Sequence, residues 1–162
     1  MDKNLPGVAT LPIVIEDGVE KISIQVVSRH PTSSWEIEMV RGRSEPFETP
    51  EQTAKREVGE ESKYEVEVSQ LGVINSDSGM LSSAVPIFAG KVIGEKRDVE
   101  EDEYEAIKGK FLISFENLIK AFRDGKMQVK IGDQVIEAFV RDPFLAYALF
   151  MAEHTGYLKS QS

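Results

Sequence analysis

Apolar and polar residues alternate along much of this 162-residue chain, in short runs that turn-forming residues separate. A period of two is typical of strands that bury one face. Asp17-Gly18 stands between the first two runs and is a strong hairpin signal. The pattern predicts strands over residues 8–15, 21–28, 35–40, 65–68, 71–74, 84–93 and 108–113, and a hairpin over 126–140.

Three other segments have helical character. The first follows Thr49, an N-cap residue, with Pro50 at the first helical position and Gln52 completing a capping-box pattern. Further helices are predicted over residues 115–123 and from Asp142-Pro143 to about residue 153. Strands and helices that mix without regular alternation indicate an α+β fold, a mixed α/β sandwich. The length fits one domain over residues 1–162.

Composition narrows the class of partner. The formal net charge of −9 disfavours nucleic acid, because phosphate backbones attract basic surfaces. The chain has no cysteine, which excludes disulfides, thiolate nucleophiles and cysteine-ligated zinc. Its longest apolar run, residues 143–152, is too short to span a bilayer, and the first residues lack the apolar region of a signal peptide. We therefore expect a cytoplasmic protein without membrane contact.

The segment from Gly42 to Glu61 carries the most chemical information. Residues three and four apart share one face of a helix, so Glu57, Glu60 and Glu61 crowd their carboxylates into one arc. Like charges repel at that spacing, whereas a hard divalent cation prefers several oxygen ligands. The sequence therefore predicts a metal site, with a solvated acidic helix as the alternative.

The spacing of Gly42, Glu48, Arg56-Glu57-Val58 and Glu60-Glu61 resembles the Nudix box, the signature of the Nudix hydrolases. Lys63 departs from that pattern, because the family has a glycine there that ends the helix in a left-handed turn. We expect Lys63 to disturb the C-cap without removing a carboxylate. Gly59, inside the helix, should cost about 1 kcal/mol relative to alanine.

Flanking segments extend the resemblance over roughly residues 8–155, toward the ADP-ribose pyrophosphatase branch. Residues 37–42, 76–79 and 102–107 are similar to segments of that branch in the same order. The resemblance implies the Nudix fold, a mixed β-sheet flanked by helices that contains the strand-loop-helix of the box. It also implies a homodimer.

The activity implied by the resemblance is hydrolysis of the pyrophosphate bond of a nucleoside diphosphate linked to another group, most closely ADP-ribose or another ADP-sugar. The cofactor implied is Mg²⁺ or Mn²⁺, with two or more ions. Arg56 would orient neighbouring carboxylates such as Glu48, and Glu103 would be the general base. The implied metal ligands are the backbone carbonyl of Arg41 and the side chains of Glu57, Glu60, Glu61 and Glu105. Arg29 and Arg41, near the expected cleft, are candidates to bind substrate phosphates, and Gly79 is a further candidate substrate-binding residue.

Several alternatives stay open at this point. Residues 100–105 could instead be a solvated charge run. Ser78 stands where the ADP-ribose branch often has a proline, so dinucleoside polyphosphates, CoA compounds and GDP-sugars are alternative substrates. Some Nudix-fold proteins bind nucleotides as sensors without hydrolysing them, but this chain keeps the glutamates that such proteins lose.

Overall fold

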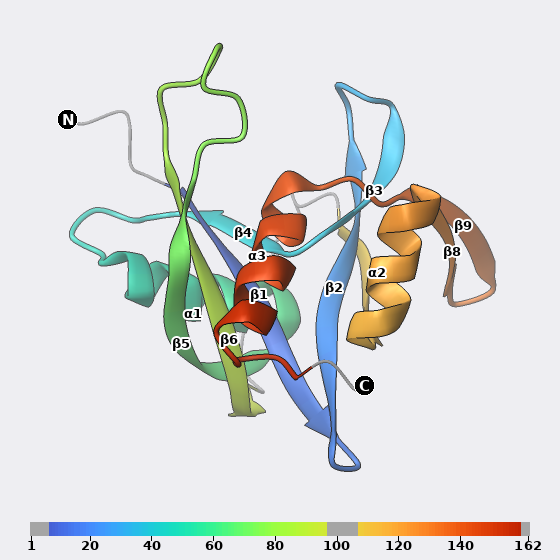
Figure 1. Cartoon of the computed structure of the whole chain (residues 1–162), viewed down its shortest axis with the longest axis horizontal. Helices are drawn as coiled ribbons and strands as arrows, with labels where there is room; N and C mark the ends of the chain where they lie inside the picture. Colours follow the sequence, from blue (N-terminus) through green and yellow to red (C-terminus); the bar gives the residue numbers. More distant parts are fainter. Residues whose placement is uncertain (1–6, 97–106, 160–162) are drawn as a thin grey trace.

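The computed structural model describes residues 7–96 and 107–159, which form a nine-stranded mixed sheet and three helices (Figure 1). No helix in these two ranges is long and apolar enough to cross a membrane. The strands are β1 Gly7–Glu16, β2 Val19–Arg29, β3 Ser34–Glu38, β4 Val40–Arg43, β5 Tyr64–Ile74, β6 Val85–Glu95, β7 Ile107–Ile113, β8 Lys126–Ile131 and β9 Gln134–Phe139. The helices are α1 Pro50–Ser62, α2 Phe115–Asp124 and α3 Pro143–His154.

Strands β1 and β2 separate soon after their hairpin, and this divergence shapes the molecule (Figure 1). They pair only next to the turn, from Ile13↔Ile22 to Glu16↔Val19. Beyond that point β4 pairs with the first residues of β1, and β7 pairs with β2. A wedge therefore opens between the two strands, on the side where β4 pairs with the start of β1 and the loop after Arg43 leads to α1.

The sheet has a hydrophobic core on each face. On β6, Ile87 and Ala89 belong to the larger cluster, which includes the buried side of α3, whereas Phe88 between them belongs to a cluster with Ala54 of α1. Successive residues of a strand point to opposite faces, so the same strand supports both helices. Figure 1 shows α3 in front of the sheet and α1 behind it.

Two predicted strand boundaries were wrong. The predicted strands 65–68 and 71–74 are one strand, β5, which continues through a register shift between Gln70 and Gly72. At this irregularity, an added Cβ on Gly72 would lie 2.0 Å from the Tyr147 hydroxyl, so the strand approaches α3 closely. The predicted strand 35–40 is divided, because β3 ends at Glu38 and β4 begins at Val40.

The expected disturbance of the α1 C-cap was also wrong. Lys63 adopts the left-handed conformation, with φ 60° and ψ 28°, and its backbone N–H donates to the Gly59 carbonyl at 3.1 Å. The helix therefore ends as a glycine would end it, with a residue for which this conformation costs about 1 kcal/mol. Gly59 is buried, and an added Cβ would lie 2.8 Å from Cδ of Lys96.

The strain at Lys63 can be measured. Lys63→Gly and Lys63→Ala both remove the ammonium group, but only glycine adopts the left-handed conformation without a steric penalty. We expect Lys63→Gly to have the higher free energy of unfolding, by about 1 kcal/mol, in urea denaturation. Equal stability of the two variants would contradict the strain.

Candidate active site

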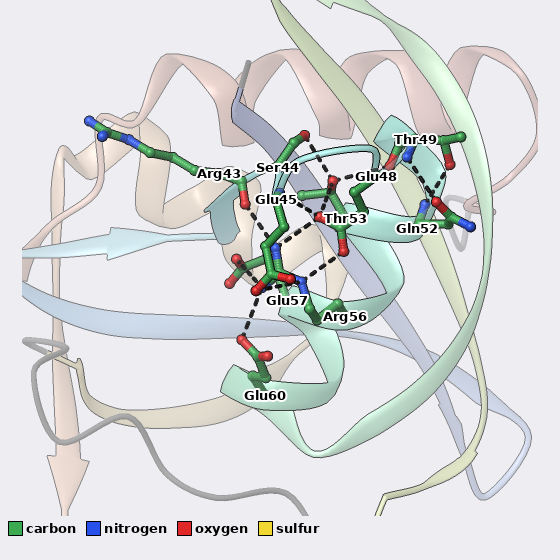
Figure 2. Close-up of polar contacts among 10 residues, drawn as sticks. All are labelled: Arg43, Ser44, Glu45, Glu48, Thr49, Gln52, Thr53, Arg56, Glu57 and Glu60. Carbon is green, nitrogen blue, oxygen red and sulfur yellow. Dashed lines mark hydrogen bonds and ion pairs between the residues drawn. The ribbon is translucent and has the colours of Figure 1, made fainter. Parts of the chain in front are cut away.

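Arg56 is the centre of a polar cluster on α1 and the preceding loop (Figure 2). Its Nε donates to Glu48 Oε1 at 2.8 Å, and its Nη1 donates to Glu57 Oε1 at 2.8 Å and to Glu60 Oε2 at 3.2 Å. Its Nη2 donates to the backbone carbonyl of Arg43 at 2.8 Å. The charge-assisted hydrogen bond between Arg56 and Glu48 that the sequence predicts is therefore present, and one guanidinium connects three carboxylates.

Glu48 anchors the loop to the helix. Besides Arg56, its carboxylate accepts hydrogen bonds from the Glu45 backbone N–H at 2.9 Å and from the Thr53 hydroxyl at 2.8 Å. The hydrogen bonds from Arg56, the Glu45 backbone and Thr53 together lower the pKa of Glu48 to about 2, against an opposing effect of burial, and the bond from Arg56 is the largest cause. The capping box of Thr49 and Gln52 that the sequence predicts is present at the start of the helix.

Gly42 lets Glu57 reach the main chain of β4. A Cβ added to Gly42 would lie 1.9 Å from Cδ of Glu57, so no other residue fits there without moving that carboxylate. Glu57 is buried, with 8% of its surface exposed. The glycine and the glutamate of the box are thus coupled by packing, and the Glu57 carboxylate lies against the chain next to Arg41.

Glu60 and Glu61 lie in less enclosed surroundings. Glu61 accepts a hydrogen bond from the Gln25 side chain at 2.8 Å, which links α1 to β2. The side chain of Glu60 is 41% exposed and contacts Arg56. Glu57 and Glu61 are one helical turn apart on the same face of α1. Glu57 packs against β4 at Gly42, and Glu61, one turn further along, reaches Gln25 of β2 and the wedge.

The donors of this cluster fit a hard divalent cation, because they are carboxylates and a main-chain carbonyl. Glu57 rests in the space that the missing Cβ of Gly42 leaves. Among the described residues, no three acidic or histidine side chains converge as a formed metal site. Hydrogen bonds hold Glu57 toward Arg56 and Glu61 toward Gln25 instead.

A cavity of about 690 Å³ occupies the wedge between β1 and β2. Its volume is within the range of small-molecule sites. Residues of both diverging strands line it, together with residues from β4, α1 and the start of α3. Glu61 brings the acidic cluster to this cavity, and Arg29, Arg41 and Arg43 bring positive charge.

Two of these arginines are already neutralised. Arg29 donates to both carboxylate oxygens of Glu38, and Arg41 pairs with Asp142 and lies 3.8 Å from Glu38. Glu38 and Asp142 are both buried. Burial raises the pKa of Asp142 to about 6, although the Arg41 guanidinium acts in the opposite direction. At neutral pH the four charges sum to zero.

Some of the predicted site residues lie at the cavity or in the Arg56 cluster, and others do not. Arg29, Arg41 and Glu61 line the cavity, and Glu57 and Glu60 join the Arg56 cluster. Gly79 lies in the exposed loop between β5 and β6 and is not among the lining residues, so its predicted role gains no support. Glu103 and Glu105 lie outside the described residues.

Sequence reasoning missed several lining residues, among them Gln25, Phe144 and Arg43. Gln25 and Phe144 come from segments far from the box, and their alternating or helical patterns indicate only packing. Arg43 lies inside the box, at a position where the pattern fixes no residue. It is exposed and pairs with no acidic residue in the described ranges, and Figure 2 shows its guanidinium pointing away from the Arg56 cluster.

Comparison with known proteins gives consistent results. Residues 6–131 match the family model of the NUDIX domain. A stretch of 103 residues is 30% identical to the "ADP-ribose pyrophosphatase" of Bacillus subtilis (strain 168), and covers 61% of this chain but only 55% of that relative. A solved "ADP compounds hydrolase" shares the fold, with a TM-score of 0.66 and 17% identity over 92% of this chain and 72% of that one. The predicted α+β fold is confirmed.

The lowered pKa of Glu48 makes its contribution to stability depend on pH. A carboxylate with a depressed folded-state pKa stabilises the fold above its ordinary pKa of 4.5, and this contribution is lost as the pH falls toward 2. We expect the difference in unfolding free energy between the wild type and Glu48→Gln to shrink by about 2 kcal/mol from pH 6 to pH 3.

Urea denaturation at both pH values measures this difference. Glu45→Gln is the matched control, because Glu45 lies 3.9 Å from Arg56 and its side chain is 69% exposed. Its effect should be small at either pH. A difference for Glu48→Gln that does not change with pH would contradict the assigned pKa.

Proposed function

The chain belongs to the NUDIX domain family, and we propose that it is a divalent-metal-dependent hydrolase of the pyrophosphate bond in a nucleoside diphosphate linked to another group. The substrate class is ADP-ribose or another ADP-sugar. The observation that carries the proposal is the position of the box: the carboxylates that Arg56 organises lie beside a cavity that Glu61 lines and that is large enough for a nucleotide.

Glu57, Glu60, Glu61 and the backbone carbonyl of Arg41 would hold the metal ions, with Glu105 as a further ligand. When bound, Mg²⁺ or Mn²⁺ neutralises the diphosphate oxygens and lowers the pKa of coordinated water. Such ions are needed here because Glu38 and Asp142 already compensate the charges of Arg29 and Arg41. Two or more ions are expected.

The residues of the chain have separate tasks in this proposal. Arg56 keeps the carboxylates of Glu57 and Glu60 apart and ordered, and Gln25 holds Glu61 at the edge of the cavity. Glu103 accepts the proton of the attacking water. Arg43, whose guanidinium no described carboxylate neutralises, binds a substrate phosphate.

The substrate class is supported by two similarities to one branch of the family. One relative is an ADP-ribose pyrophosphatase, although the match covers about half of its length. The order of the flanking segments also resembles that branch. A homodimer in the cytoplasm belongs to the same proposal, and light scattering of the purified protein tests the dimer.

The experiment that tests the function is a product-release assay on a panel of nucleoside diphosphate compounds. ADP-ribose, ADP-glucose, GDP-mannose, dinucleoside polyphosphates and CoA are each incubated with Mg²⁺, Mn²⁺ or EDTA. We expect metal-dependent cleavage, fastest for ADP-sugars. No turnover of any compound, together with tight nucleotide binding in calorimetry, would contradict the hydrolase and favour a sensor.

Variants in the same assay test the metal ligands. We expect Glu57→Gln and Glu61→Gln to reduce kcat by at least about 100-fold, because each removes a charged oxygen ligand from the metal. Glu51→Gln is the matched control, since Glu51 lies on the same helix but is exposed at its first turn. Thermal unfolding shows that each variant is folded. Wild-type activity of either ligand variant would refute the assignment.

A further inference from the structure

The positive charge of the Arg41 guanidinium is compensated by carboxylates of the protein. Nη2 pairs with Asp142 and lies 3.8 Å from Glu38, and Nε is buried without a described partner. Two buried carboxylates therefore compensate the positive charge from the protein side. An arginine in these surroundings is a poor receptor for a further anion, because much of its field is already cancelled.

One face of the same guanidinium is covered by an aromatic ring. Cζ of Arg41 lies 4.4 Å from the ring centre of Phe144, in the first turn of α3, where Asp142 is the N-cap. Asp142 also accepts the Phe144 backbone N–H at 3.1 Å. One aspartate therefore fixes both the ring and the arginine, and the two stack as a rigid pair.

This pair faces the cavity. Both Arg41 and Phe144 line it, and the Arg41 side chain is 32% exposed. Val8, Val27 and Val85 contribute apolar surface to the same lining. A planar, delocalised cation between apolar walls suits an aromatic ring of a ligand, since guanidinium groups stack on π-systems and are weakly hydrated.

We propose that Arg41, backed by Phe144 and fixed by Asp142 and Glu38, is the stacking platform for the nucleobase of the substrate. This inference rests on the proposed function and reassigns the Arg41 side chain from phosphate binding to base binding. The two neighbouring arginines then have different tasks, because no carboxylate of the described residues compensates the charge of Arg43, which is left to bind phosphate. Arg41 is thereby a determinant of preference for nucleotide compounds over other phosphates.

The test compares two ligands that share a sugar phosphate and differ by the base. AMP and ribose 5-phosphate are titrated in Mg²⁺ buffer by calorimetry, which needs no turnover. We expect wild-type protein to bind AMP more tightly. Stacking of one base contributes about 1–3 kcal/mol to binding. Arg41→Met should therefore lower the affinity for AMP about 10-fold and leave the affinity for ribose 5-phosphate unchanged.

Arg41→Lys is the discriminating variant, because it keeps the charge but lacks the planar face. We expect it to lose the preference for AMP as Arg41→Met does. Arg43→Met should lower the affinity for both ligands by the same factor. The matched control is Arg141→Met: Arg141 lies 4.2 Å over the Phe139 ring and pairs with Glu36, yet it does not line the cavity. It should leave both affinities unchanged.

Three results would overturn the inference. If Arg41→Lys keeps the preference for AMP, Arg41 acts through its charge and not by stacking on the base. An equal loss of affinity for both ligands in Arg41→Met would show that Arg41 binds the phosphate. Equal affinity of the wild type for AMP and ribose 5-phosphate would show that the cavity has no binding site for the base. Because neither ligand is hydrolysed, these results are independent of the panel assay, and an inactive protein that still prefers AMP would contradict the hydrolase alone.

Discussion

The site depends on one interaction: the guanidinium of Arg56 lies among three carboxylates that would otherwise repel one another. Like charges on adjacent helical positions destabilise a helix, and burial of Glu57 adds a desolvation cost. Arg56 offsets both by donating to Glu48, Glu57 and Glu60. The same guanidinium also holds the loop, through the carbonyl of Arg43. Helix, loop and charge are therefore organised by a single side chain.

The sheet places this cluster beside a cavity. Because β1 and β2 pair only at their hairpin, the space between them opens toward β4, where Gly42 allows Glu57 to reach the main chain. Within that space the charges of Arg29 and Arg41 are compensated by buried carboxylates. A diphosphate would therefore meet little free positive charge from these two arginines. This is the physical reason that the proposed chemistry requires metal ions.

Local patterns predicted the elements and the box well. The capping box and the α1 helix follow from spacing within a few residues, and the ion pair of Arg56 with Glu48 follows from the resemblance to the Nudix box. The pattern could not predict Gln25, Phe144 or the pairing of Arg41 with Asp142, since these contacts join segments far apart in the chain. It also misjudged Lys63, because this residue adopts the left-handed conformation itself, at a cost of about 1 kcal/mol, and keeps the backbone hydrogen bond to the Gly59 carbonyl.

Direct measurement of Mn²⁺ binding tests the organising role of Arg56. Electron paramagnetic resonance reports free Mn²⁺ as protein is added, for wild type and for Arg56→Gln. Coulomb's law alone predicts tighter binding by the variant, because a positive charge near the carboxylates is removed. If Arg56 orders the carboxylates as ligands, the variant binds Mn²⁺ more weakly than wild type, and this is the result expected. Equal or tighter binding by Arg56→Gln would contradict it.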